Sequence, residues 1–525
     1  MWSLWKGYKE KYSQKKLGYG EVCVLDRFKL LESDFSAILT RESTNYKCIS
    51  VTNTKFNKYN ILTKNIKRKE MESTSNANLL NRIGRLKIQC FRGSDYVPID
   101  GAKINVKGTE GSESLGIYDL VTDSAGLTQV IDLGAPPLEY SLDIYNHKMP
   151  YSLYDITVEK NGFKPIVIKG CQILPTQTAF QICNLKPSLG SGDMKQEVIN
   201  VPPNVLYGNY PPKIPEEEDK SLPSSTSGVV LSQPVIPEYI IVHQGDPNDT
   251  SAQNYKVSFK DYIKIVASCE IYSTWTNSAL RANIYCIISF TLSRIFTQWY
   301  RVKGKNFDIT SSTAYDQAFS YGRNIYDSIS QIVDVIFSTY IRRIGKKQPL
   351  FTQYCDGKNV TCPKWLSQWG SQQLGSQGLR PFDILTHYYG TDIELVTAKK
   401  VSGSPIPYPG EELIVGLSSL SVREIQGQLN IISRYYPSIS RVEENGIYGP
   451  MTEKAVKIFQ HIFTLPETGI VDYATWYKIS DVFVGVTRFA ELTTTESSRL
   501  WGRREFIPPI IAGLDDKRKT PKFYY

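Results

Sequence analysis

Glu270 is the acidic residue whose setting in this sequence best fits acid–base chemistry. It follows an expected helix over about residues 259–269. Its neighbours in sequence are apolar or aromatic: Cys269, Ile271, Tyr272 and Trp275. Burial against such a wall raises a carboxyl pKa above its ordinary value of about 4.3, as a general acid near neutral pH requires. We therefore predict Glu270 as a catalytic acid; the alternative is a surface glutamate at a helix end.

The next element should hold this glutamate in place. A second helix is expected after the turn at Trp275, with Thr276 or Asn277 as its N-cap. Its predicted apolar face consists of Leu280, Ile284, Ile287, Ile288, Leu292 and Ile295. We place both helices in a mixed α+β catalytic domain over residues 238–400.

The run DYIKIVASCEIYSTWTNSALRA (residues 261–282) resembles the signature of the stage II sporulation protein D (SpoIID/LytB) family of lytic transglycosylases. In that family the glutamate matched by Glu270 is catalytic. The resemblance continues in order through Asp308-Ile309-Thr310, Ala314-Tyr315-Asp316-Gln317, Leu366-Ser367-Gln368-Trp369-Gly370, Gly378, Ile384-Leu385 and Tyr388-Tyr389-Gly390. The departures from the family pattern are Arg281 for Lys, Asn283 for Gln and Ile288 for Arg.

The resemblance implies cleavage of the MurNAc–GlcNAc glycan strand by one glutamate, with formation of 1,6-anhydro-muramic ends. A single carboxyl suffices because the C6 hydroxyl of the same sugar is the nucleophile. Predicted substrate contacts are Tyr315, Gln317, Gln368 and Trp275; the alternative for the first three is a buried hydrogen-bond network. Asp308 and Asp316 are expected to be structural.

The C-terminal run from Val422 to Ile479 predicts a compact helical module. Ala455, Ile458, Phe459 and Ile462 recur at helical spacing, and glycines fall where turns are needed. The pattern resembles the three-helix peptidoglycan-binding domain of cell-wall hydrolases, and we assign residues 411–485 to it. The predicted binding residues are Asn445, Gly446, Tyr448, Gly449, Asp472 and Trp476. Asn445 stands where the family often has an acidic residue.

Residues 85–185 alternate short apolar runs with turn signals, which predicts strands. The order, with a Thr-Asp-x-x-Gly turn at residues 122–126, resembles the carboxypeptidase-regulatory or transthyretin-like β-sandwich. We expect a β-sandwich pro-domain here. Residues 186–237 are rich in proline and are predicted to be a solvated linker, in which a protease could cut.

The order of these parts resembles the family of clostridial spore cortex-lytic enzymes. That resemblance implies a precursor activated during germination by a subtilisin-like protease. Two other functions stay open: a non-catalytic peptidoglycan-binding scaffold of the spore, and a cortex amidase or other hydrolase. An amidase would need His/Glu metal ligands, and the chain has four histidines in 525 residues.

Nine cysteines lack the dense spacing of a disulfide scaffold, so most are expected to be reduced and buried. Cys355 and Cys362 could bind zinc or form a disulfide, but no His lies near them, and free thiols are the preferred interpretation. We predict no cofactor and no metal.

The formal net charge of +9 does not predict nucleic-acid binding. Residues 1–70 carry +8 of it, and the rest of the chain is nearly neutral. No run resembles a membrane span or a secretory signal, so we expect a soluble protein of the spore cortex or coat region. Residues 1–84 are an uncertain pre-region or an extension ahead of Met71, and residues 486–525 are a tail. The predicted fold class is multidomain α and β.

Overall fold

The computed structural model describes residues 81–93, 95–109, 116–188, 195–218, 220 and 233–500. Residues 1–80 of the predicted pre-region, with Met71, lie outside these residues, as does the tail beyond residue 500; the last residues of the pre-region, 81–84, are described and include the start of a strand at Ile83. The chain divides into two units, residues 1–80 and residues 81–525, of which only the second contains described residues. Within the described residues, no helix is both long and apolar enough to cross a membrane.

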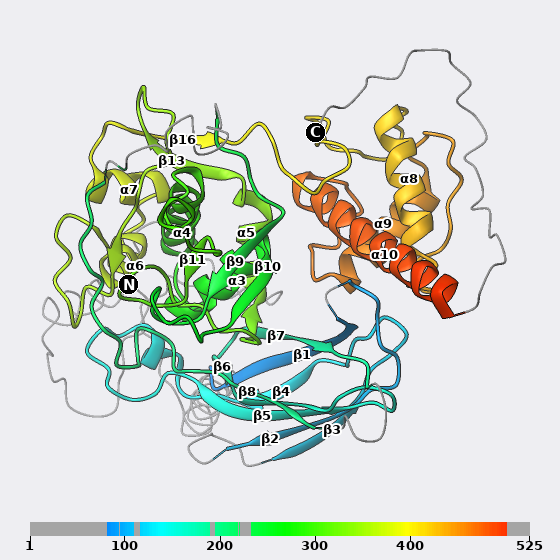
Figure 1. Cartoon of the computed structure of the whole chain (residues 1–525), viewed down its shortest axis with the longest axis horizontal. Coiled ribbons are helices and arrows are strands. Elements are labelled where there is room, and N and C mark those ends of the chain that lie inside the picture. The colour runs from blue at the N-terminus through cyan, green and yellow to red at the C-terminus, as the bar shows by residue number, and fades with distance from the viewer. Residues whose placement is uncertain are drawn as a thin grey trace, which may run out of the picture. The chain divides into compact units, whose positions relative to one another are not determined.

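The first part of the second unit consists of two sheets, which Figure 1 shows as adjacent layers. One sheet has the order β3-β2-β5-β6-β8, and the other has the order β12-β7-β1-β4. Their strands are β1 (Ile83–Arg92), β2 (Lys103–Gly108), β3 (Ile117–Val121), β4 (Ile131–Gly134), β5 (Ser152–Glu159), β6 (Ile166–Ile173), β7 (Thr178–Leu185), β8 (Glu197–Asn200) and β12 (Ile325–Tyr326). Two of these strands, β8 and β12, come from outside the predicted sandwich at residues 85–185.

The predicted turn after β3 is present and has a clear physical basis. The Asp123 carboxylate accepts hydrogen bonds from the Ala125 and Leu127 amides, both at 2.9 Å. Gly126 has a φ of +72°, where a Cβ would lie 2.5 Å from the Cys90 carbonyl oxygen. Only glycine fits this position, because both the backbone angle and the available space exclude a side chain.

The middle part of the chain is a mixed α+β region built around α4. Its helices are α3 (Phe259–Glu270), α4 (Asn277–Phe296), α5 (Asp327–Ile336), α6 (Gln368–Ser376) and α7 (Pro381–Tyr389). Its strands are β9 (Tyr239–His243), β10 (Asn254–Ser258), β11 (Ile309–Thr310), β13 (Thr339–Arg343), β14 (Tyr354–Cys355), β15 (Leu366–Ser367) and β16 (Ile393–Thr397). Short 3-10 turns lie at Leu138–Ser141 and Arg301–Lys303.

The two helices expected around Glu270 are confirmed. The Ser258 side chain caps α3, and the Thr276 side chain caps α4 by accepting from the Ala279 amide. The prediction of a single apolar face on α4 was too narrow, because this helix is buried on nearly all sides. Polar residues such as Asn283 and Arg294 are buried on it as well. A helix in the centre of a domain is enclosed on every side, so periodicity underestimates its burial.

The last part contains α8 (Leu420–Ile432), α9 (Pro450–Ile462) and α10 (Tyr473–Leu500), which pack together in Figure 1. These are the three helices expected for the C-terminal module. The helix α10 continues to Leu500, so the tail predicted from residue 486 is in part helical.

Asp327, the first residue of α5, gives a prediction about pH. Burial raises its pKa from 3.8 to about 6, although Lys87, Arg85 and Lys264 oppose the shift. Its Oδ1 atom is buried without a hydrogen-bond partner. Between about pH 4 and 6 the unfolded chain releases this proton before the folded chain does, so the carboxylate destabilises the fold as pH rises. Asp327→Asn should therefore stabilise the protein at pH 7 by about 2 kcal/mol.

The measurement is the thermal unfolding midpoint of wild type and variant at pH 7 and at pH 4. We expect a higher midpoint for the variant at pH 7 and nearly equal midpoints at pH 4. Equal shifts at the two pH values would mean that the effect does not come from this ionisation.

Candidate functional site

The Glu270 side chain is buried, with 2% of its surface exposed, at the C-terminal end of α3. Its Oε1 atom accepts a hydrogen bond from the Ala318 amide at 2.7 Å. Its Oε2 atom has no hydrogen-bond partner among the described residues. The alternative of a surface glutamate is therefore wrong.

The surroundings of Glu270 favour its protonated form. Burial raises the pKa of Glu270, while the charge of Lys213, the nearby Tyr354 hydroxyl and the Ala318 amide lower it, and burial prevails. A carboxyl with a raised pKa retains its proton to higher pH and can donate it to a leaving oxygen.

Gln317 fixes the tyrosine that lies beside this carboxyl. Its amide oxygen accepts from the hydroxyls of Tyr262 (3.0 Å) and Thr291 (2.8 Å), so its nitrogen must be the donor to Tyr354 Oη, at 3.1 Å. The Tyr354 hydroxyl oxygen therefore accepts a hydrogen bond from Gln317. The hydroxyl proton of Tyr354 must point away from Gln317, and Glu270 is the acidic group beside it. Gln317 is fully buried and acts through Tyr354, so the structure places it in a buried network and not in contact with a substrate.

A cavity of about 120 Å³ lies over Glu270. Its lining includes Glu270, Tyr354, Gln368 and Asp356, together with residues 205 and 208–213. Of the predicted substrate contacts, Gln368 lines this cavity. Trp275 does not: it is buried against Trp369 and donates from Nε1 to the Ser141 carbonyl at 3.0 Å. Tyr315 does not line it either, and its carbonyl accepts from Arg294.

Asp356 and Lys213 are cavity residues that we did not predict from the sequence. Asp356 follows β14, and its carboxylate accepts from the backbone amides of residues 358, 359 and 360 at 2.9 to 3.2 Å. The run YCDGKNVTC (residues 354–362) indicates a turn at this position, because an Asp followed by Gly is typical of turns. Lys213 lies in the region predicted to be linker, where no motif indicated a role.

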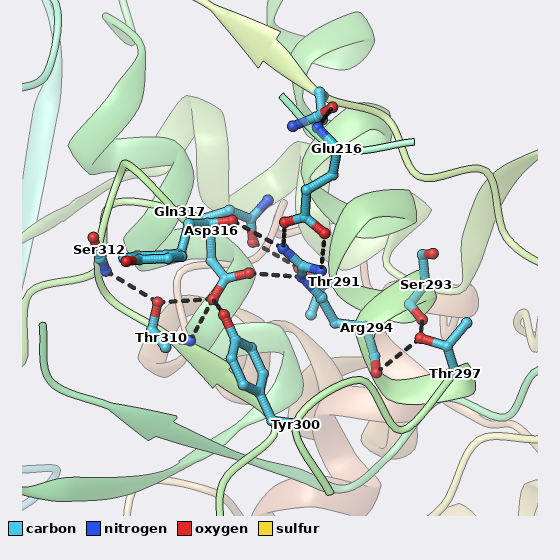
Figure 2. Close-up of polar contacts among 12 residues, drawn as sticks. Glu216, Thr291, Ser293, Arg294, Thr297, Tyr300, Thr310, Ser312, Asp316 and Gln317 are labelled. Atoms are coloured by element: carbon cyan, nitrogen blue, oxygen red, sulfur yellow. Dashed lines mark hydrogen bonds and ion pairs between the residues drawn. The ribbon is translucent and has the colours of Figure 1, made fainter. Parts of the chain in front are cut away.

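Asp316 has a structural role, as expected. Figure 2 shows its carboxylate between Arg294, Tyr300 and Thr310. Asp316 Oδ1 pairs with Arg294 Nε at 2.7 Å, and Oδ2 accepts from the Tyr300 hydroxyl and from the amide and hydroxyl of Thr310 at 2.7 to 2.9 Å. Asp308 is occupied too, since it accepts from the Ile241 amide and from Arg301.

Cys355 and Cys362 form a disulfide, with Cα atoms 5.7 Å apart. The preference for free thiols was therefore wrong; the turn after β14 brings these two residues together, which their separation in sequence did not reveal. The other cysteines of the described residues are free and buried, as predicted. Among the described residues there is no group of three or more His, Cys, Asp or Glu side chains that could hold a metal ion.

Two buried glutamines organise the C-terminal helices in the same way. Gln426 accepts from the Gly446 amide at 2.9 Å and donates to the Ile447 carbonyl at 2.9 Å. Gln460 accepts from the Gly469 amide at 2.8 Å and donates to the Ile470 carbonyl at 2.9 Å. Each amide also reaches a threonine on the following helix, Thr452 or Thr475. We call these two arrangements the glutamine clamps.

The residues predicted to bind peptidoglycan mostly have structural partners. Tyr448 is 1% exposed and donates to the Gly469 carbonyl; Trp476 is fully buried and donates to the Ile406 carbonyl. Asp472 accepts from the Thr475 amide at the start of α10, and Asn445 accepts from the Ile447 amide. Gly446 lies in the first clamp, and Gly449 precedes α9 as its N-cap. The motif residues that we predicted to bind peptidoglycan are therefore mostly residues that stabilise the fold of the domain.

Comparison with known families identifies this C-terminal part. Residues 418–479 match the family model described as "Putative peptidoglycan binding domain". The match covers the two glutamine clamps and the helices α8 and α9. The chain thus carries a peptidoglycan-binding domain, which associates it with the bacterial cell wall.

The comparisons with curated proteins and with solved structures do not bear on the function of the chain. No curated protein matches the chain. Three solved structures resemble part of it: the Bacillus anthracis TIE protein (18% identity, 20% of this chain and 17% of that one, TM-score 0.14), the minor pilin GBS52 of Streptococcus agalactiae (14%, 21% and 46%, 0.14), and chlorocatechol 1,2-dioxygenase from Pseudomonas putida (15%, 23% and 59%, 0.13). The chain spans less than two thirds of each of these proteins.

The clamps allow a prediction about the binding domain. Gln426→Leu leaves the Gly446 amide without its partner and the Ile447 carbonyl with the Gly449 amide alone, which should cost about 1–3 kcal/mol of local stability. Differential scanning calorimetry of the full chain should show a lower midpoint for this domain, and less protein should sediment with purified peptidoglycan.

Gln428→Leu is the matched control, because Gln428 is equally buried on α8 but donates only to Glu424 on the same helix. We expect a small effect from this change. Equal losses from both substitutions would show that the clamp has no special role.

Proposed function

We propose that the protein is a lytic transglycosylase that cleaves the glycan strand of spore cortex peptidoglycan and is activated by proteolysis during germination. The observation that carries this proposal is the Glu270 carboxyl: buried, favoured in its protonated form, and next to a cavity on a chain that also carries a peptidoglycan-binding domain. The sequence resemblance to SpoIID-type enzymes supports the same assignment.

In the proposed reaction, Glu270 donates its proton to the oxygen that links MurNAc to GlcNAc. The bond from MurNAc C1 to that oxygen breaks, and the C6 hydroxyl of the same MurNAc unit bonds to C1. The Glu270 carboxylate then accepts the hydroxyl proton and is ready for another cycle. The products are a 1,6-anhydro-MurNAc end and a free 4-hydroxyl on GlcNAc, with no water consumed.

Asp356 favours a second candidate, which is hydrolysis. Two carboxyl groups about 5–9.5 Å apart serve most glycosidases, and Asp356 lines the same cavity as Glu270. Its three hydrogen bonds from backbone amides stabilise the carboxylate and tie it to its own turn, which makes it a less available base.

The chemical nature of the product ends distinguishes the candidates. Purified cortex peptidoglycan is incubated with the full chain after limited proteolysis, and also with the chain carrying Lys213→Ala, Glu216→Ala and Glu218→Ala, which weakens the hold of residues 201–218 on the cavity. The soluble fragments are analysed by mass spectrometry. Anhydro-muramic ends support the transglycosylase; reducing ends support hydrolysis and a test of Asp356→Asn. Free stem peptides would indicate an amidase, and binding without any product would favour the scaffold function.

A further inference from the structure

Residues 201–218, which we call the strap, run over the cavity that contains Glu270. The Val205 amide donates to the Cys269 carbonyl at 2.8 Å, one residue before Glu270. Further along, the Ile214 amide donates to the Ala314 carbonyl at 2.7 Å. Residues 205 and 208–213 form part of the cavity lining. The segment predicted to be a solvated linker is therefore bound to the catalytic region, and that prediction was wrong for these residues.

The strap carries one lysine, Lys213, into the lining of the cavity that contains Glu270. The Lys213 ammonium lies between the rings of Phe290 and Tyr354, 5.0 and 5.1 Å from their centres, and donates to the Asp316 carbonyl. Burial lowers the pKa of Lys213, and of the acidic groups that oppose this shift Glu270 acts most strongly. A cation here favours the carboxylate form of Glu270, which cannot donate a proton.

Two forked ion pairs hold the downstream end of the strap. Glu216 accepts from both Nη atoms of Arg294, at 2.6 and 3.0 Å, as Figure 2 shows. Glu218 accepts from Nε and Nη2 of Arg343, both at 2.7 Å. Gln353 also bonds the strap backbone on both sides, accepting from the Glu216 amide and donating to the Ile214 carbonyl. Paired, charge-assisted bonds of this kind fix position as well as adding stability.

We propose that the strap is a built-in inhibitor of the glycan-cleaving site, an inference that rests on the proposed function. It occupies the place above Glu270 where a glycan strand would lie, and it places Lys213 in the lining of the same cavity. The space left is about 120 Å³, whereas pockets for small ligands usually measure about 300–1,000 Å³. A sugar chain therefore cannot reach Glu270 until the strap leaves.

A cut in the chain beyond the strap does not by itself free the site. The upstream end of the strap continues from β8, which pairs with β6 in the five-stranded sheet. The sheet region is also joined to the catalytic region by Gln172, which exchanges hydrogen bonds with Asn324, and by the pairing of β12 with β7. After cleavage between Lys220 and Gln233, the strap would remain bound through these contacts, so activation requires its dissociation as well.

The test uses the full chain with a site for a specific protease inserted between Lys220 and Gln233. It is compared with the same chain carrying Lys213→Ala, Glu216→Ala and Glu218→Ala, which removes the charges of the strap and leaves the catalytic region unaltered. Glu217→Ala is the control, since Glu217 is an exposed residue of the same segment. Each form is assayed, before and after cutting, for fragments released from purified cortex peptidoglycan and for amide hydrogen exchange of residues 201–218.

We expect the uncut wild type and the control to release fragments at least 100-fold more slowly than the triple variant. Cutting the wild type should leave the two pieces together on gel filtration and raise activity less than threefold, while strap amides stay protected. In the triple variant these amides should exchange fast.

An uncut wild type as active as the triple variant would overturn the inhibition and leave the proposed function standing. Full activity on cutting, with separation of the pieces, would overturn the requirement for dissociation. If no form releases fragments, the proposed function fails and the inhibition fails with it.

Discussion

Glu270→Gln should lower the rate of glycan cleavage by about 1,000-fold or more in a form of the protein whose strap has been released. The glutamine amide has nearly the same shape as the carboxyl, but it can neither give a proton to the glycosidic oxygen nor accept one afterwards. Loss of a general acid or base typically costs 10²- to 10⁴-fold, and in the proposed reaction one residue serves as both. The release of soluble fragments over time measures the effect.

The same substitution should leave the fold intact. Burial already disfavours the charged form of Glu270, so a neutral side chain should keep or raise the thermal midpoint. Asp308→Asn is the control, because Asp308 is a partly exposed acid of the same region and does not line the cavity. A glutamine variant that retains more than a tenth of the wild-type rate would rule out Glu270 as the acid.

Arg294→Met should have the largest effect on stability in the middle α+β region, about 3–5 kcal/mol. The guanidinium is 1% exposed, and it pairs with Asp316, which is completely buried. Methionine fills much of the space, but the Asp316 carboxylate would be left in the interior without its cation. The expected result is a large fall in the thermal midpoint and in the yield of soluble protein.

Arg301→Met is the matched control, because the pair of Arg301 with Asp308 is partly exposed and should contribute about 1 kcal/mol or less. Adding Asp316→Asn to Arg294→Met should recover part of the loss, since it removes the unpaired charge. If the double substitution costs as much as the sum of the two single ones, the two side chains are not coupled.

The sequence predicted local elements better than their assembly. The two helices around Glu270, the turn at Gly126 and the three C-terminal helices carry strong local signals: N-caps, helical spacing and glycines that adopt positive φ. The strand β12 has no such signal, because two residues form a strand only when β7 is already beside them. Pairing between distant segments is a tertiary property that no local pattern encodes.

The catalytic candidate could be predicted from its apolar neighbours, whereas the strap could not. Prolines and an acidic run at residues 211–219 indicate an extended, solvated segment, and residues 201–218 indeed form neither helix nor strand. Its binding depends on Arg294 and Arg343, which lie about 80 and 125 residues further along the chain. The substrate contacts predicted at Gln317 and Trp275 failed for a related reason: polar or aromatic groups give no sign in sequence of which way they face.

The glutamine clamps have a consequence for how the binding domain can change. In each clamp a side chain on a helix, together with a short backbone bridge, sets the path of the neighbouring loop. The outward side chains of these loops, such as Ile447 with 52% of its surface exposed, are not themselves clamp partners. Such a module can exchange its outer residues, and adapt to a chemically different polymer, while its scaffold stays the same.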